Sequence, residues 1–214
     1  KETMTRMTAK PRMNGNPFTK MRSNAGTENC KRQTGLVAAL FLFLVSGLML
    51  ACKPSPLKDL GKIGAFDLKN TEGSNVQWQE FRGAPAFVFF GYTYCPDFCP
   101  MTMHKVEKAY TESGKPSDWP RLIFISVDPQ RDTPEALDDY MAKFSFPSLA
   151  LTGSEQDLRQ AAKAFGVTFY QDPKDPELMQ HSPTLFVVDE DGRIRYLFKF
   201  SQKASELQEI VEAL

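Results

Sequence analysis

Residues 85–100, PAFVFFGYTYCPDFCP, constrain the fold more than any other stretch of the sequence. The apolar run at 86–90 is unbroken, which predicts a strand buried on both faces. It is followed by Cys95 and Cys99, two thiols separated by three residues, at the point where a helix is expected to begin. A helix N-terminus favours the thiolate form of cysteine. The pattern therefore predicts a site for a soft metal ion or for disulfide chemistry.

Strand-like and helix-like segments alternate along the rest of the chain. The expected order is a hairpin at 65–78, a strand at 86–90, a helix at 98–113, a strand at 121–128, a helix at 134–144, a strand at 149–152, a helix at 154–165, an edge strand at 167–171, a loop at 172–180, a hairpin at 184–200 and a helix at 205–214. Such alternation predicts a parallel central sheet, and the last hairpin must pair antiparallel. The predicted class is α/β: a thioredoxin-like fold with a mixed central sheet flanked by helices and an N-terminal hairpin extension.

The N-terminal quarter of the chain has a different character. Residues 1–35 are polar and lack apolar periodicity, which predicts a disordered leader. Residues 36–51 are apolar and uncharged and are followed by Cys52, as in a bacterial lipoprotein signal that is cleaved before a lipid-bearing cysteine. An uncleaved membrane anchor and a buried core helix are the alternatives. Residues 52–62 are expected to be a tether, and 63–214 a single domain outside the cytoplasm of a bacterium, in the cell envelope.

Charge and cysteine content limit the classes of function that the chain can have. Residues 1–51 hold eight basic and two acidic residues out of 26 of each, so residues 52–214 keep 18 basic and 24 acidic residues. An acidic surface without a basic stripe argues against nucleic acid as a partner. With Cys30 in the leader and Cys52 at the modification position, Cys95 and Cys99 remain as a lone pair. In an oxidising compartment such a pair forms a disulfide or binds a metal.

Two thiolates satisfy a metal ion poorly, so a third donor is needed. The chain has two histidines: His104, on the outward face of the expected helix, and His181, two residues before Pro183. In a thioredoxin-like fold the loop before such a proline faces the cysteines, so Cys95, Cys99 and His181 are the predicted metal ligands. Two sulfurs and one nitrogen suit Cu(I) or Cu(II), and zinc could use the same atoms together with a water.

Two carboxylates are candidates for orienting these ligands through hydrogen bonds. Asp97 lies inside the cysteine loop and Asp128 at the end of the strand expected at 121–128. The alternatives are a solvent-exposed turn residue for Asp97 and a cap on the following turn for Asp128. Tyr92, Tyr94 and Phe98 are expected to form the wall of the site, although ordinary packing explains them equally well.

Three segments together resemble the Sco/SenC family of copper-binding proteins: GYTYCPDFCP at 91–100, SVDPQRDTP at 126–134, and the His181-Ser182 pair. The resemblance covers roughly residues 60–214. It implies a membrane-tethered copper metallochaperone in which Cys95, Cys99 and His181 bind copper and Asp128 is associated with the site. The implied partner is the cytochrome c oxidase subunit that carries the CuA centre, with other copper carriers or thiol oxidoreductases as further partners.

One departure from the family pattern keeps an alternative open. Pro183 and Thr184 after Ser182 are more similar to thiol oxidoreductases of the same fold. A membrane-tethered thiol-disulfide reductase, with Cys95 and Cys99 as its catalytic pair, would keep the cysteines of a target reduced. A weaker third hypothesis is a peroxidase that uses Thr93. Thiol exchange needs no histidine, whereas a copper chaperone needs His181.

Overall fold

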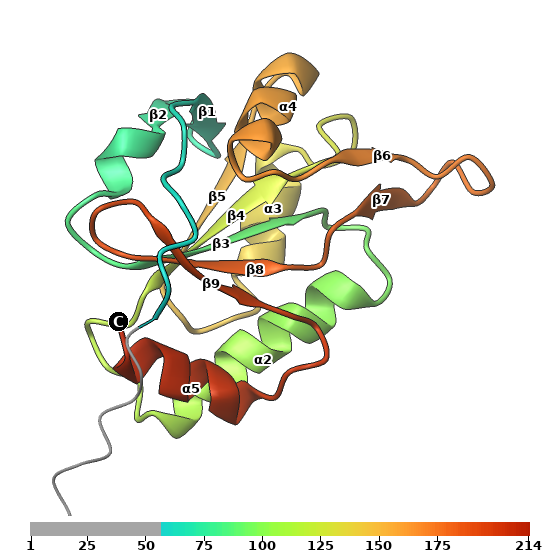
Figure 1. Cartoon of the computed structure of the whole chain (residues 1–214). Helices are drawn as coiled ribbons and strands as arrows, with labels where there is room; N and C mark the ends of the chain where they lie inside the picture. The colour runs from blue at the N-terminus through green and yellow to red at the C-terminus, as the bar shows by residue number, and fades with distance from the viewer. Residues whose placement is uncertain (1–56) are drawn as a thin grey trace, which may run out of the picture. The chain divides into compact units, whose positions relative to one another are not determined.

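The structure is a computed structural model that describes residues 57–214 of the 214-residue chain (Figure 1). The leader expected at 1–35, the apolar segment expected at 36–51 and Cys52 lie outside the described residues. Within the described range, no helix combines the length and the apolar character needed to cross a membrane.

The described part of the chain contains nine strands and five helical segments. The strands are β1 (Asp67–Asn70), β2 (Asn75–Gln77), β3 (Ala86–Gly91), β4 (Arg121–Ser126), β5 (Ser148–Thr152), β6 (Phe169–Gln171), β7 (Met179–His181), β8 (Leu185–Val188) and β9 (Ile194–Phe198). The helices are the 3-10 helix η1 (Trp78–Phe81), α2 (Phe98–Glu112), α3 (Pro134–Met141), α4 (Glu155–Ala164) and α5 (Ala204–Glu212).

Seven of the strands form one mixed sheet in the order β2-β1-β5-β4-β3-β8-β9 (Figure 1). β3, β4 and β5 run parallel at its centre, as expected for strands joined by helices. The hairpins β1–β2 and β8–β9 are antiparallel and form its two edges. The predicted mixed sheet with hairpins at both ends is confirmed.

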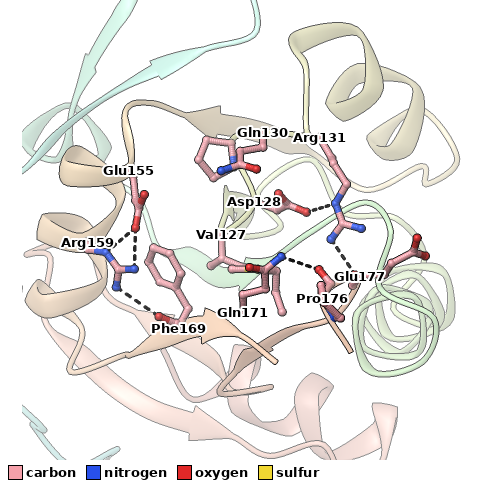
Figure 2. Close-up of a pocket in the computed structure, with 12 residues that line it drawn as sticks. Val127, Asp128, Gln130, Arg131, Glu155, Arg159, Phe169, Gln171, Pro176 and Glu177 are labelled. Atoms are coloured by element: carbon pink, nitrogen blue, oxygen red, sulfur yellow. Dashed lines mark hydrogen bonds and ion pairs between the residues drawn. The ribbon is translucent and has the colours of Figure 1, made fainter. Parts of the chain in front are cut away.

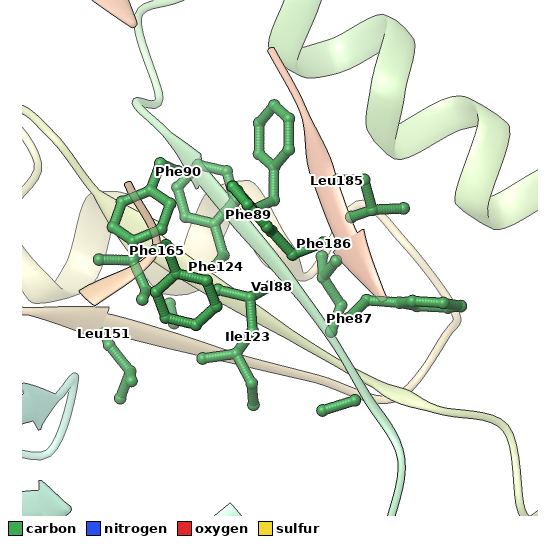
Figure 3. Close-up of a cluster of buried hydrophobic side chains, with 14 of the residues drawn as sticks. Phe87, Val88, Phe89, Phe90, Ile123, Phe124, Leu151, Phe165, Leu185 and Phe186 are labelled. Carbon is green, nitrogen blue, oxygen red and sulfur yellow. The ribbon is translucent and has the colours of Figure 1, made fainter. Parts of the chain in front are cut away.

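Apolar side chains of β3 point alternately to the two faces of the sheet and contribute to a core on each face (Figure 3). On one face, the ring centroid of Phe89 lies 6.1 Å from that of Phe124, which lies 5.5 Å from that of Tyr140 on α3. On the other, the Phe90 ring centroid lies 5.4 Å from that of Phe165, next to α4. Because successive side chains of a strand point to opposite faces, β3 anchors both layers. Its C-terminal end is therefore a rigid support for the cysteine loop.

The second sheet is a two-stranded ribbon made of β6 and β7, which is not hydrogen-bonded to the seven-stranded sheet. The prolines of residues 172–180 predict a loop there, but Met179–His181 pair with Phe169–Gln171. The loop prediction is therefore wrong at its C-terminal end. His181 lies on a strand, opposite Phe169, and not on a free loop.

Residues 57–62, the described part of the expected tether, pair with the edge of the sheet. The Leu60 N–H donates to the Ile194 carbonyl at 2.8 Å, and the Ile194 N–H donates to the Gly61 carbonyl at 2.9 Å. Backbone pairing with β9 thus begins before residue 63, where the domain is expected to start.

Candidate metal centre

The cysteine loop, residues 92–97, connects β3 to α2. Cys95 lies in this loop and Cys99 in the first turn of α2. The Cys99 backbone N–H donates to the Cys95 sulfur at 3.4 Å, so the helix directs one of its unpaired N-terminal donors at that sulfur. Both residues are free thiols, Cys95 half-buried and Cys99 buried. One sulfur is thus accessible from solvent while the other is covered by protein.

His181 reaches the cysteine loop from a distant part of the chain. It lies 82 residues after Cys99, and its Nε2 is 3.6 Å from the Cys99 Sγ. One ligand atom from each of Cys95, Cys99 and His181 can be chosen so that all three lie within 4.8 Å of one another. The structure therefore brings together the three residues that the sequence predicts as metal ligands.

Hydrogen bonding and ring packing orient the imidazole of His181. Its Nδ1 lies 3.1 Å from the Ser182 carbonyl oxygen. Because a carbonyl oxygen only accepts, Nδ1 donates to it, and Nε2 is the ring nitrogen that faces the Cys99 sulfur. The ring also makes edge contacts with Phe89 and Tyr92, at centroid distances of 6.1 and 5.9 Å. These contacts hold the imidazole in the orientation that a metal ligand needs.

The two thiols differ in acidity. A hydrogen bond from the Cys99 thiol is the main cause that lowers the pKa of Cys95 to about 4, with smaller contributions from His181 and the backbone N–H of Asp97. The same hydrogen bond, together with burial, raises the pKa of Cys99. At neutral pH the metal-free pair therefore consists of a Cys95 thiolate that accepts a hydrogen bond from a Cys99 thiol.

This difference predicts the order of thiol modification. At about pH 6 an ordinary cysteine is almost fully protonated, so iodoacetamide is expected to alkylate Cys95, an accessible thiolate, well before Cys99. Brief treatment of the reduced, metal-free protein followed by peptide mass spectrometry measures both rates. Equal rates, or faster modification of Cys99, would contradict the assignment of the thiolate.

The two carboxylates expected to orient the ligands make other contacts. Asp97 is exposed, and its backbone N–H, not its carboxylate, bonds to the Cys95 sulfur. Asp128 is buried just after β4, where its Oδ2 accepts from the Arg131 Nε at 2.5 Å. Within residues 57–214, no hydrogen bond joins either carboxylate to the side chain of a predicted ligand. The expected hydrogen bonds to the ligands are thus not formed by either carboxylate in the part of the chain that the structure describes.

Asp132 is the carboxylate that the sequence interpretation missed. Its side chain is only 2% exposed. Its Oδ1 accepts from the Thr93 N–H at 3.0 Å and from the Thr93 hydroxyl at 2.7 Å, and its Oδ2 accepts from the Ser126 hydroxyl at 2.6 Å. Burial raises the pKa of this carboxyl group above its ordinary value. Asp132 ties the beginning of the cysteine loop to the end of β4.

In the sequence, Asp132 stands directly before Thr133 and Pro134, a pattern typical of a helix start. The residue that caps α3 is Thr133, whose hydroxyl accepts from the Ala136 N–H at 3.2 Å. Position along the sheet is the signal that could have identified Asp132, because residues that follow neighbouring parallel strands gather at one edge. The Thr93 hydroxyl donates to Asp132 at 2.7 Å, and the peroxidase hypothesis stays a prediction.

Comparison with known proteins identifies the family. A family model described as SCO1/SenC matches residues 56–214. The chain belongs to the SCO1/SenC family. Human mitochondrial SCO1 homolog is 30% identical over 149 residues, 67% of this chain and 50% of the human protein. The SCO2-like protein of Rickettsia conorii is 30% identical over 183 residues, 82% of this chain and 89% of its own. The chain thus spans half the length of the human relative and most of the rickettsial one.

Solved structures of SCO1/SenC proteins share the fold. Bradyrhizobium japonicum ScoI with copper bound has a TM-score of 0.63 and 31% identity, covering 71% of this chain and 98% of that one. Apo Sco1 from Thermus thermophilus has a TM-score of 0.63 and 32% identity, and the match covers 76% of this chain and 97% of that one. BsSco, described as a member of the Sco family of cytochrome c oxidase assembly proteins, has a TM-score of 0.59 and 23% identity. The match covers 74% of this chain and 97% of that one. These matches confirm the predicted thioredoxin-like fold.

The aromatic residues around the SCO1/SenC cysteine motif divide into two groups. Tyr92 is 2% exposed and packs against His181, and its hydroxyl accepts from the Met179 N–H at 3.3 Å. Tyr94 and Phe98 are 61% and 45% exposed. Of the three residues expected to wall the site, Tyr92 does so, whereas the other two present large surfaces to solvent.

The donor set of this SCO1/SenC chain suits one soft ion. Two sulfurs and one imidazole nitrogen form the cluster, without the carboxylate oxygens that a hard cation requires. Metal–ligand bonds of about 2.0 to 2.3 Å place two ligands of one ion at most about 4.6 Å apart. The donors lie within 4.8 Å of one another. A small adjustment of side chains would therefore close them around an ion.

Proposed function

We propose that this SCO1/SenC protein is a copper metallochaperone that delivers copper to the CuA centre of cytochrome c oxidase during assembly. The observation that carries the proposal is the convergence of Cys95, Cys99 and His181 within 4.8 Å. Two relatives support it. A structure of the Bradyrhizobium protein holds copper, and BsSco is described as belonging to a family of oxidase assembly proteins.

The geometry suits a cargo ion that must be held and then released. Soft thiolate sulfur selects copper, and the combination with imidazole accepts both Cu(I) and Cu(II). Cys99 is buried, whereas Cys95 is half-buried at the surface end of the cluster. An acceptor thiolate can approach from the side of Cys95 and replace the ligands one at a time. Copper would pass to the acceptor without becoming free in solution.

Metal analysis tests this proposal directly. The chain purified anaerobically and incubated with copper is expected to retain one copper ion per chain. The Cu(II) form should show a thiolate-to-copper absorption band that disappears in the Cys95→Ser variant. Exclusive retention of zinc, or a copper band that survives this substitution, would overturn the assignment.

A thiol-disulfide reductase is the second candidate, favoured by the Cys95 thiolate beside a protonated Cys99. The Cys95 sulfur would attack a disulfide of the partner and form a mixed disulfide while the partner's other sulfur leaves as a thiolate. Cys99 would lose its proton and attack the Cys95 sulfur, releasing the partner's second thiolate and leaving a Cys95–Cys99 disulfide. This cycle requires both cysteines and leaves His181 without a function.

We place the protein outside the cytoplasm of a bacterial cell, attached to a membrane. The support is the sequence of residues 36–51 and Cys52, an apolar run before a cysteine. Attachment would use either a lipid on Cys52 or an uncleaved helix at 36–51. Both arrangements would keep the cluster at the membrane surface, where a membrane-bound oxidase subunit is assembled.

A further inference from the structure

The segment that carries His181 is held in place largely by side chains. This histidine ribbon, residues 169–181, includes β6 and β7, which are not hydrogen-bonded to the central sheet. A pocket of about 370 Å³ lies between the ribbon, residues 127–131 and the N-terminal part of α4 (Figure 2). Arg131 and Arg159 line this pocket, and each donates to one carboxylate and to one backbone carbonyl of the ribbon.

Arg131 contacts both the cysteine loop and the histidine ribbon, which carry Cys95 and His181. Its Nε donates to the Asp128 carboxylate at 2.5 Å, and its Nη2 donates to the Glu177 carbonyl of the ribbon at 2.8 Å. The guanidinium carbon also lies 5.1 Å from the ring centroid of Tyr94 and 5.9 Å from that of Tyr92, both in the cysteine loop. One side chain thus joins the end of β4, the ribbon and the cysteine loop.

Arg159 makes the same types of bond in a different setting. It donates to the Glu155 carboxylate and, at 3.3 Å, to the Phe169 carbonyl, and it stacks on the Phe169 ring of the ribbon itself. The Arg159 and Glu155 side chains are 52% and 61% exposed, whereas those of Arg131 and Asp128 are 29% and 7% exposed. Exposed ion pairs contribute little to stability. The two arginines therefore form a matched comparison within one pocket.

We propose that Arg131 is a positioning residue that sets the distance between His181 and the two cysteine sulfurs. Through Glu177 it holds the ribbon, and through Tyr94 and Tyr92 it holds the cysteine loop. Asp128, expected from the sequence to be associated with the site, acts through Arg131 by fixing the direction of its guanidinium. The expected effect of Arg131 on copper affinity rests on the proposed function. Its expected effect on the contact between the His181 and Tyr92 rings in the metal-free protein does not.

The chemistry of the guanidinium explains why arginine is needed at this position. It is planar, donates in several fixed directions at once and can lie flat on an aromatic ring while doing so. A lysine ammonium is a single point of charge on a flexible stem. It could pair with Asp128 but would not hold the Glu177 carbonyl and the Tyr94 ring at the same time.

The experiment compares Arg131→Met and Arg131→Lys with Arg159→Met in the full chain. NMR cross-relaxation between the rings of His181 and Tyr92 in the metal-free protein reports the position of the ribbon. Competition with a Cu(I) chelator reports copper affinity. Arg131→Met is expected to lose the ring contact and about 10- to 100-fold in copper affinity, as is usual when a partner that orients metal ligands is removed.

The other variants decide whether the effect is specific. Arg131→Lys retains a cation beside Asp128, so it should fold normally yet still lose the ring contact. Arg159→Met should keep the contact and change copper affinity by no more than about fivefold, the scale of an exposed ion pair. The proposal would be overturned if both Arg131 variants kept the ring contact and the wild-type copper affinity. It would also be overturned if Arg159→Met lost the ring contact and copper affinity to the same extent as Arg131→Met. If the wild-type chain binds no copper, the proposed function fails and the NMR comparison still tests Arg131.

Discussion

His181→Ala is expected to lower copper affinity by more than about 100-fold, because even the partners that merely orient metal ligands account for 10- to 100-fold. The substitution removes the only nitrogen donor of the cluster and leaves two sulfurs, which satisfy the ion poorly. Chelator competition measures the affinity. In the same variant, the rate at which the cysteine pair reduces a small disulfide should remain close to wild type, because Cys95 and Cys99 are untouched.

His104→Ala is the matched control for this prediction. His104 is an exposed residue of α2, and its ring makes an edge contact with Phe144, at a centroid distance of 5.6 Å. It is the other of the two histidines in the chain and lies outside the cluster. Its removal should leave copper affinity unchanged. Full affinity in His181→Ala would remove His181 from the site, and an equal loss in His104→Ala would show that the effect is not specific to the cluster.

Asp132→Ala is expected to destabilise the protein by about 2 to 4 kcal/mol at neutral pH, because each buried polar group left unpaired costs about 1 to 3 kcal/mol. The change removes the acceptor of three hydrogen bonds, two from Thr93 and one from Ser126. Urea unfolding measures the free energy. The same change frees the start of the cysteine loop, so copper affinity should also fall.

The raised pKa of Asp132 predicts how Asp132→Asn depends on pH. Burial keeps the proton on the folded carboxyl group at pH values above its ordinary pKa of 3.8. A group with a raised native pKa stabilises the fold below its unfolded pKa and loses that contribution as pH rises through the native value. Asparagine does not titrate. The stability of the wild type relative to Asp132→Asn should therefore decrease as pH rises above the ordinary pKa of 3.8.

Two results would contradict this role of Asp132. One is an Asp132→Ala variant as stable as wild type. The other is a difference between wild type and Asp132→Asn that stays constant or increases with pH. Asp97→Ala provides a surface reference, since Asp97 is exposed and its side chain does not cap α2. It should change the free energy of unfolding by less than about 0.5 kcal/mol, as is usual for surface positions.

Much of the fold could be predicted because its elements carry local signals. β3 is buried at every residue, as its apolar run predicts. The helix expected at 154–165 begins where the serine and the aspartate three residues later indicate a cap, and Ser154 accepts from the Asp157 N–H at 3.2 Å. α3 begins at Pro134 as expected but ends at Met141, three residues early. The end of a helix depends on packing as well as on local sequence.

The errors concern features without a local signal. Met179–His181 has no alternating apolar pattern and becomes a strand because Phe169–Gln171 lies beside it. Asp97 lies close to the cysteines in sequence, yet its carboxylate points to solvent. Asp132 is 37 positions beyond Cys95 in the printed sequence, yet it holds the cysteine loop through Thr93. Distance along the chain is a poor guide to contact across a sheet.

The sequence by itself determined the order of helices and strands along the chain and the helix that receives the cysteines, because periodicity and capping are local properties, and together with the predicted fold it named Cys95, Cys99 and His181 as candidate ligands. Only the tertiary structure decided which carboxylate supports the cysteine loop, how His181 is oriented and that Arg131 connects the three segments around the site. These depend on atoms meeting within about 3 Å, the range of a hydrogen bond. Such distances are set by how β3, β4 and the histidine ribbon pack against one another.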